Sequence, residues 1–310
     1  SAVSRGSAIF GGEPRPGERQ DPGPARLAGR TRPFQSPGFP VSCAAMQPTL
    51  TIATRAARSA GRLILRYFER VDQVQIHVKT RNDFVSEVDR AAEDTIIQEL
   101  RSKYPDHAFL AEESGARGRS DFEWVIDPLD GTTNYLHGFP QFSISIALRH
   151  RGRLECGLVY DPLREEMFTA ERGGGALLND RRIRVANQTG LDGALIGTGF
   201  PFRDQRFLDS YLAMFRTILE NTAGIRRPGS AALDLAYVAC GRTDGFWELG
   251  LSEWDMAAGA LLVSEAGGRV SDLRGGDRFF ETGNIIGGNL KVHRALLQAL
   301  QPHLNESLSA

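Results

Sequence analysis

The stretch that decides the fold is Trp124-Val125-Ile126-Asp127-Pro128-Leu129-Asp130-Gly131-Thr132-Thr133-Asn134. Its apolar start predicts the end of a buried strand. Asp127 then lies at the carboxyl end of that strand, and we expect Pro128 to stop the strand because proline cannot donate a ladder hydrogen bond. Asp130 adds a second carboxylate, and the residues after it predict a tight turn that opens a short helix. Two carboxylates beside a helix N-terminus are typical of a place where a divalent cation and a phosphate bind together. The alternative is an ordinary Asp-Pro turn followed by a helix cap.

The composition of the chain is that of a globular protein. Its 310 residues are enough for one large domain or two modest ones. The 37 lysines and arginines nearly balance 38 aspartates and glutamates, so the charge does not indicate a general binder of polyanions. Three of the basic residues are lysines (Lys79, Lys103 and Lys291) and the others are arginines. An apolar content of 41% allows a proper core.

The cysteines and the apolar runs indicate the compartment. Cys43, Cys156 and Cys240 are odd in number and show no CxxC spacing. This pattern argues against a disulfide framework or a zinc site and fits a reducing cytoplasm. No apolar run approaches the roughly 18–20 residues of a membrane span. We therefore expect a cytoplasmic protein that does not cross a membrane.

The first 45 residues differ in composition from the rest. They contain seven of the 15 prolines, six arginines and three acidic residues, and they lack apolar periodicity. Such a segment cannot bury enough apolar surface to offset the entropy of ordering, so we expect a disordered extension. Met46 opens the first well-patterned segment, so we expect the extension to be a tag or upstream translation. A regulatory arm is the alternative.

Two patterns of secondary structure follow Met46. Helical periodicity predicts helices at Pro48–Phe68 and about 86–100, and alternation predicts strands at 74–78, 108–111, 143–149, 154–160 and 167–170. After residue 187, strands at 195–198, 225–227 and 245–247 alternate with helices at 207–219, 230–240 and 255–266, before a strand pair and a closing helix at 292–304. We therefore expect an α+β half (46–188) carrying metal-binding carboxylates, an α/β half (189–304) completing the site, and a tail (305–310).

Further carboxylates stand at the ends of predicted elements. Asp255, in Trp254-Asp255-Met256-Ala257-Ala258-Gly259, lies where a loop gives way to a helix of small residues that can approach another backbone closely. Glu112 and Glu113 follow a strand end. Alone, an N-cap aspartate or an acidic turn is common without any function. Together with Asp127 and Asp130, these residues predict an oxygen-rich site for Mg²⁺, because uncompensated carboxylates in one cleft would repel each other.

These motifs resemble the inositol monophosphatase family of Mg²⁺-dependent, lithium-sensitive phosphatases. The resemblance rests on Asp127-Pro-Leu-Asp-Gly-Thr132, Trp254-Asp255-x-Ala-Ala-Gly259 and Glu112-Glu113-Ser114, and it runs from about Met46 to Leu304. The stretches 47–61, 197–202 and 229–237 are similar to the bacterial SuhB-type branch of that family. The resemblance implies a layered αβαβα sandwich, the fold of the inositol monophosphatase and fructose-1,6-bisphosphatase superfamily, and a homodimer.

The resemblance also implies roles for individual residues. Two or three Mg²⁺ per subunit would be bound by Glu112, Asp127, the carbonyl of Leu129, Asp130 and Asp255. The catalytic residues would be Lys79, Asp89, Glu112 and Thr132, with Asp89 and Thr132 helping to deprotonate the attacking water. The substrate would be held by Asp130, Gly131, Thr132, Gly229, Ser230, Ala231, Glu248 and Asp255.

The function implied is hydrolysis of inositol 1-phosphate by an activated water, without a covalent nucleophile. Fructose 1,6-bisphosphate and 3′-phosphoadenosine phosphates are alternative substrates of the same chemistry. A different alternative is an interaction protein, because SuhB-type proteins in some bacteria join transcription antitermination complexes with RNA polymerase and Nus factors. The pairs Arg181-Arg182 and Arg226-Arg227 suit such a role, although solvated surface or a subunit interface accounts for them equally well.

Overall fold

The computed structural model describes residues 48–70, 76–80, 83–201, 205–305 and 308, with the backbone alone for 76–80, 83–86 and 205. The extension expected at residues 1–45 lies outside the described residues. The first described element, α1 (Pro48–Phe68), and α2 (Glu87–Arg101) are packed side by side, and the hairpin of β1 (Ile76–Thr80) and β2 (Asp83–Ser86) connects them. Both helices have the range expected from their periodicity, since α1 buries Leu50, Ala57 and Ile64 on one face.

Eight strands form the larger sheet, in the order β10-β9-β8-β7-β6-β5-β3-β4. Only β3 and β5 are parallel, and the strands from β5 to β10 form a continuous antiparallel meander. The bounds are β3 (Ala108–Ala111), β4 (Gly115–Arg117), β5 (Phe122–Asp130), β6 (Ser143–His150), β7 (Arg153–Asp161), β8 (Glu166–Glu171), β9 (Gly175–Leu178) and β10 (Arg181–Arg182), with the short helix α3 (Thr132–Leu136) after β5.

Five strands form the smaller sheet, in the order β12-β11-β13-β15-β14. β11 is parallel to β12 and β13, whereas β15 is antiparallel to both of its neighbours. The strands are β11 (Leu195–Thr198), β12 (Gly224–Arg226), β13 (Gly245–Glu248), β14 (Arg269–Ser271) and β15 (Ile285–Gly288). The helices of this half are α4 (Leu208–Glu220), α5 (Ala231–Ala239), α6 (Glu253–Glu265), α7 (Phe279–Thr282) and α8 (Leu290–Leu300), with 3-10 turns at Gln205–Phe207 and Gln301–His303.

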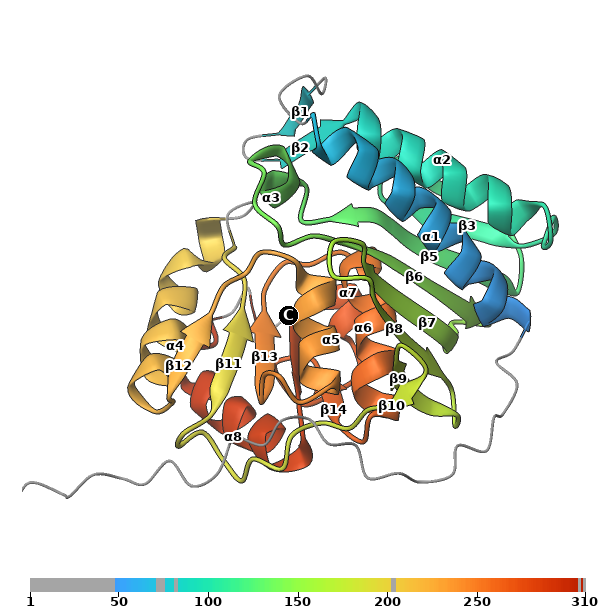
Figure 1. Ribbon diagram of the computed structural model, residues 1–310. Coiled ribbons are helices and arrows are strands. Elements are labelled where there is room, and N and C mark those ends of the chain that lie inside the picture. The colour runs from blue at the N-terminus through green and yellow to red at the C-terminus, as the bar shows by residue number, and fades with distance from the viewer. Residues whose placement is uncertain (1–47, 71–75, 81–82, 202–204, 306–307, 309–310) are drawn as a thin grey trace, which may run out of the picture. The chain divides into compact units, whose positions relative to one another are not determined.

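Helices and sheets alternate in five layers, which confirms the expected αβαβα sandwich (Figure 1). Side chains alternate between the two faces of each sheet. Trp124 points to the layer of α1 and α2, whereas Val125 points to α5 and α6. In the smaller sheet, Phe246 packs on the α5 and α6 layer and Trp247 on the layer of α4 and α8. The central helix layer is therefore buried between the two sheets.

The small residues of α6 allow that central layer to be thin. A Cβ atom on Gly259 would lie 2.5 Å from Leu235 Cβ of α5, and a Cβ atom on Gly157 of the larger sheet would lie 3.0 Å from Ala258 Cα. These contacts agree with the expectation that the helix after Trp254 approaches other backbone closely. α6 can occupy the space between sheet and helix only because its side chains are small.

Gly259→Val is expected to lower the free energy of unfolding by about 2–3 kcal/mol, because the added carbons overpack the contact with Leu235. Urea denaturation monitored by circular dichroism measures this change. Gly190→Val is the matched control, since nothing lies within 4 Å of a Cβ atom at that position. Equal stability of the two variants would contradict the packing described here.

Two sequence expectations differ from the structure in detail. Pro128 does not stop its strand: β5 continues to Asp130 through a bulge, with Asp127 opposite Ser145 and Asp130 opposite Ser143. The bulge carries an extra residue on β5, so a proline that donates no ladder hydrogen bond is accommodated there. The closing helix α8 begins earlier than expected, capped by Asn289, and gives way at Gln301 to a 3-10 turn that contains Pro302.

Within the described residues, no helix is both long enough and apolar enough to pass through a bilayer. Cys156 and Cys240, the cysteines in this part of the chain, are not joined in a disulfide.

Candidate active site

A cavity of about 540 Å³ lies where the ends of β3, β5 and β13 meet the N-terminal ends of α5 and α6. It is lined by residues of both halves of the chain. Ten residues expected to serve the site line it: Glu112, Asp127, Leu129, Asp130, Gly131, Thr132, Gly229, Ala231, Glu248 and Asp255. The cavity therefore collects carboxylates, a backbone turn and a helix start that are far apart in the sequence.

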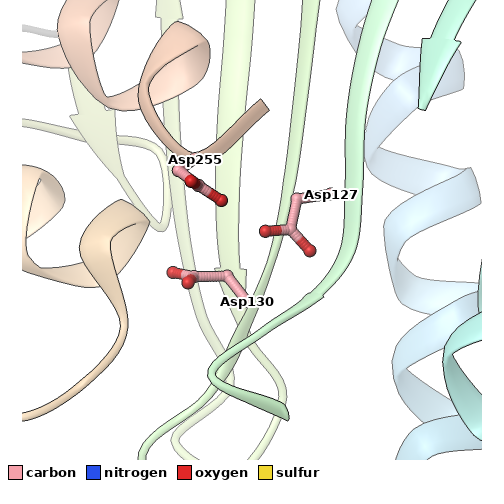
Figure 2. A group of neighbouring side chains, drawn as sticks. All are labelled: Asp127, Asp130 and Asp255. Atoms are coloured by element: carbon pink, nitrogen blue, oxygen red, sulfur yellow. The ribbon is translucent and has the colours of Figure 1, made fainter. Parts of the chain in front are cut away.

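Three of these carboxylates form a compact group. Asp127, Asp130 and Asp255 each offer an oxygen, and the three oxygens lie within 4.8 Å of one another (Figure 2). The first two residues flank the bulge of β5, which turns both side chains toward the cavity. Asp127 is further held by its own turn, because Oδ1 accepts a hydrogen bond of 3.0 Å from the backbone N–H of Leu129.

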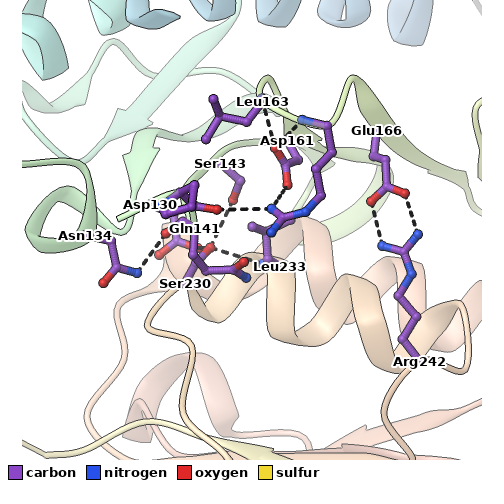
Figure 3. Close-up of polar contacts among 12 residues, drawn as sticks. Asp130, Asn134, Gln141, Ser143, Asp161, Leu163, Glu166, Ser230, Leu233 and Arg242 are labelled. Carbon is purple, nitrogen blue, oxygen red and sulfur yellow. Dashed lines mark hydrogen bonds and ion pairs between the residues drawn. The ribbon is translucent and has the colours of Figure 1, made fainter. Parts of the chain in front are cut away.

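Asp130 is held at the start of α5. Its Oδ2 accepts hydrogen bonds from the Ser230 hydroxyl at 2.5 Å and from the backbone N–H of Ala232 at 2.8 Å. The Ser230 hydroxyl also lies 3.2 Å from that of Ser143 on β6 (Figure 3). Ser230 was expected in the substrate pocket, but it is buried and faces Asp130. In the structure its hydroxyl supports a carboxylate of the three-aspartate group.

Asp255 comes from the first turn of α6. It is the third residue of the helix and not its N-cap, as the pattern had suggested, because the helix begins at Glu253 after Ser252. Its Oδ2 accepts a hydrogen bond of 2.7 Å from the backbone N–H of Ser252, which forms one side of a capping box. The residue thus stabilises a helix start and lies at the three-aspartate group at the same time.

Burial and like charges dominate the electrostatics of this group. Burial is the main cause that raises the pKa of Asp127 well above its ordinary value, and the charges of Glu112, Asp130 and Asp255 raise it further. Burial likewise raises the pKa of Asp130 to about 6, although the hydrogen bonds from Ser230 and Ala232 oppose the rise. The side chains that raise the Asp127 pKa are all carboxylates. Such a donor set fits a divalent cation with oxygen ligands, which would relieve the repulsion.

Without Mg²⁺, the free energy of unfolding is expected to fall as the pH rises from about 4 to above 6. Folding raises the Asp130 pKa from 3.8 to about 6, so the native state holds a proton that the unfolded chain releases in this window. The share of Asp130 in this loss amounts to about 3 kcal/mol at most. Thermal unfolding in EDTA at pH 4.5 and 7.5 measures it. Saturating Mg²⁺ should remove this loss of stability, and Asp130→Asn should make it smaller. If wild type and Asp130→Asn differed in stability by the same amount at both pH values, the raised pKa would not belong to Asp130.

Glu112 and Leu129 lie beside the three aspartates. Glu112 follows β3, lines the cavity and raises the pKa of both Asp127 and Asp130 through its charge, but it is not part of the three-aspartate group. Leu129 is buried, and its carbonyl accepts a hydrogen bond of 3.0 Å from the Thr132 hydroxyl. Both residues therefore line the same cavity as the three-aspartate group.

The expected partnership of Thr132 and Asp89 is present in the structure. The Thr132 hydroxyl donates a hydrogen bond of 2.9 Å to Asp89 Oδ1, which is fully buried in the first turn of α2. This contact joins residues 43 positions apart at the wall of the cavity. Lys79 lies on β1, and its side chain is outside the described part of the chain.

The cavity is lined by further residues, some expected from the sequence and some not. Glu248, at the end of β13, lines it as expected, together with Gly229 and Ala231. Phe200 and Arg227 line it too, with the guanidinium 5.0 Å from the centroid of the ring. The pair Arg226-Arg227 was considered as a surface for a partner, as solvated surface or as a subunit interface, because nothing in the sequence indicates that Arg227 lines a cavity.

Known proteins resemble this chain over the whole segment that contains the cavity. The profile of the Inositol monophosphatase family matches residues 45–307. The Nus factor SuhB of Pseudomonas aeruginosa is 59% identical over 269 residues, which cover 85% of this chain and 99% of that protein. The crystal structure of the extragenic suppressor protein SuhB from Bartonella henselae has 46% identity and a TM-score of 0.80, covering 82% of this chain and 99% of that chain. The inositol monophosphatase from Anabaena (Nostoc) sp. PCC 7120 has 40% identity and a TM-score of 0.74, covering 82% and 95%.

Proposed function

Because this chain belongs to the inositol monophosphatase family, we propose that it is a Mg²⁺-dependent phosphatase that hydrolyses inositol 1-phosphate to inositol and phosphate. The observation that carries the proposal is the group of Asp127, Asp130 and Asp255, whose oxygens lie within 4.8 Å of one another in a cavity. The relative from Anabaena, which is an inositol monophosphatase by name, supports the choice of substrate.

The three aspartates would hold Mg²⁺, with Glu112 and the Leu129 carbonyl as further ligands. When bound, the cations would stabilise charge on the phosphate and the leaving alkoxide and lower the pKa of water. The protein contributes the position of these oxygens, since Asp130 is fixed by α5 and Asp255 by the start of α6. Two separate helices therefore set the geometry of one acidic site.

Thr132 and Asp89 would move the proton. We assign to the Thr132 hydroxyl the role of accepting a proton from the attacking water while it passes its own proton to Asp89 Oδ1 along the existing hydrogen bond. Asp89 is fully buried in the first turn of α2, so the carboxylate that takes up this proton is shielded from bulk solvent. The backbone N–H groups of Gly131 and Thr132 would bind phosphate oxygens, since the first N–H groups of a helix have no partner within it.

Glu248 would accept hydrogen bonds from the hydroxyl groups of the substrate. Its side chain lines the same cavity as Gly229, Ala231 and the three aspartates. A carboxylate that accepts hydrogen bonds from neighbouring hydroxyls suits a polyol such as inositol. Fructose 1,6-bisphosphate is the alternative with a similar hydroxyl pattern, and the presence of Phe200 in the cavity keeps adenosine phosphates among the alternatives.

A phosphate-release assay tests the proposal. The purified chain is offered inositol 1-phosphate, fructose 1,6-bisphosphate and 3′-phosphoadenosine 5′-phosphate, each with Mg²⁺, with EDTA and with added Li⁺. We expect Mg²⁺-dependent, Li⁺-inhibited release with the highest kcat/KM for inositol 1-phosphate. A preference for another ester would correct the substrate, and no release from any ester would reject the phosphatase.

We propose a second function as a partner in transcription antitermination. The support is the relative from Pseudomonas aeruginosa, which is named a Nus factor and matches 85% of this chain. Arg181, Arg182 and Arg226 are exposed and would be available to such a partner. Binding of the purified chain to purified RNA polymerase and Nus factors, measured with wild type and Asp130→Asn, separates this role from catalysis.

Sedimentation equilibrium in the same buffers tests the homodimer that the family resemblance implies.

A further inference from the structure

Asn134 joins the turn after β5 to the loop before α5. It lies in the short helix α3, and its side-chain N–H groups donate to the carbonyls of Gln141 and Pro228, each at 2.8 Å, and of Gly229 at 3.2 Å. Two of these carbonyls are 94 and 95 positions away in the sequence. Figure 3 shows Asn134 beside Gln141, on the same side of the site as Ser230 and Asp130. One side chain thus connects the two halves of the chain at the cavity.

The backbones on either side of this connection are in direct contact. Gly131 has φ 96°, and a Cβ atom there would lie 2.9 Å from the Gln141 carbonyl oxygen and 3.2 Å from that of Gly229. These two oxygens are among those that accept hydrogen bonds from Asn134. The amide of Asn134 therefore satisfies carbonyls that would otherwise face each other across the turn. Without this amide, the carbonyl oxygens of Gln141 and Gly229 would lie near each other with no donor between them.

The loop held by Asn134 leads directly to a support of the three-aspartate group. Ser230 follows Gly229, caps α5, and donates its hydroxyl to Asp130 Oδ2. Ala232, two residues further, donates its N–H to the same oxygen. Any displacement of the Pro228–Gly229 backbone therefore displaces the donors that orient Asp130.

We propose that Asn134 is a positioning residue that fixes the start of α5 against the turn after β5 and thereby sets the place of Asp130 in the Mg²⁺ site. Asn134 acts through Ser230 and Ala232, and the hydrogen bonds of its own amide go to backbone carbonyls. The inference rests on the proposed function for the identity of the cation. It deepens that function by assigning assembly of the site to a side chain that contributes no carboxylate.

The test is a Mg²⁺ titration of the full chain without substrate, read by isothermal calorimetry and by thermal shift. Asn134→Ala is expected to raise the Kd for Mg²⁺ at least about tenfold. The matched control is Asn221→Ala, which removes a similar amide-to-carbonyl bond of 2.7 Å from an exposed site at the end of α4 and should leave the Kd unchanged. Asn134→Gln, which keeps the amide and displaces it by one methylene, is the second variant should Asn134→Ala not fold.

A double-mutant cycle identifies the route of the effect. In a Ser230→Ala background, Asn134→Ala should change the Kd for Mg²⁺ less than in wild type, because the Ser230 hydroxyl, one of the two donors through which Asn134 acts, is already removed and only the Ala232 N–H remains. Additive effects would overturn the proposed route. A lower melting temperature in EDTA with an unchanged Kd for Mg²⁺ would show a structural role only and overturn the inference.

The two proposals fail in different ways. Wild-type chain that binds Mg²⁺ but releases no phosphate from any ester would reject the phosphatase and leave the positioning role to the titration. Wild-type chain that binds no Mg²⁺ would overturn the positioning role, because there would be no site to assemble.

Discussion

Asp130→Asn is expected to reduce kcat for inositol 1-phosphate by about 10³-fold or more while the fold is retained. The substitution removes a charge from the group in which Asp127, Asp130 and Asp255 offer oxygens within 4.8 Å of one another. Binding of a catalytic cation is worth several kcal/mol of transition-state stabilisation, and each 1.36 kcal/mol corresponds to a factor of ten in rate. The asparagine oxygen can still accept hydrogen bonds from Ser230 and Ala232, so α5 keeps its support.

The measurement is phosphate release under saturating Mg²⁺, with circular dichroism and thermal unfolding in EDTA as the tests of folding. The variant should be at least as stable as wild type in EDTA at pH 7.5, because a buried carboxyl with a raised pKa has been neutralised. Asp209→Asn, at an exposed position in the first turn of α4, is the control and should keep full activity. Undiminished turnover by Asp130→Asn would refute its role in catalysis.

Thr132→Val is expected to lower kcat by about 10²–10³-fold with little change in KM. Valine retains the shape of threonine but lacks the hydroxyl that donates to Asp89 Oδ1 at 2.9 Å and contacts the Leu129 carbonyl at 3.0 Å. General acid–base contributions from a positioned side chain are typically 10²–10⁴-fold. The backbone N–H of residue 132 is unchanged, so binding of the phosphate should be retained.

Steady-state kinetics as a function of pH distinguish this role from a structural one. Thr132→Ser restores a hydroxyl at the same position and should recover most of the activity. Its failure to do so, with a folded variant, would indicate that the methyl group matters and not the proton. An effect on KM alone would instead assign Thr132 to substrate binding.

Much of the fold could be read from local patterns. The helical period at Pro48–Phe68 and the alternation in residues 143–170 depend on neighbouring residues only, and the helix and the three strands formed as expected. The structure differs from these predictions where the tertiary context outweighs the local preference of a single residue. Pro128 predicted the end of a strand, but the ladder with β6 continues because a bulge tolerates the missing donor. Asp255 resembled an N-cap, yet Ser252 holds that position and makes Asp255 the third residue of α6.

The candidate site could be predicted in its chemistry but not in its construction. Asp127, Asp130 and Asp255 were singled out as carboxylates at element ends, and Thr132 with Asp89 as a pair through the family resemblance. The bonds from Asn134 to Pro228 and Gly229 span more than 90 residues and carry no local pattern. The hydrogen bond from the Ser230 hydroxyl to Asp130 could not be predicted either. A serine at a helix N-cap has the same sequence pattern whether its side chain faces a cavity or a carboxylate.

The sequence by itself determined most of the helices and strands in their order and the identity of the acidic residues, because periodicity, capping and charge are properties of neighbouring positions. The layered architecture followed from the resemblance to a family. Only the tertiary structure decided which oxygens meet. Asp130 and Asp255 are 125 positions apart, and they converge because α5 and α6 are packed between two sheets that each contribute an end to the same cavity. Convergence of this kind depends on the packing of layers, which no local stretch of the chain encodes.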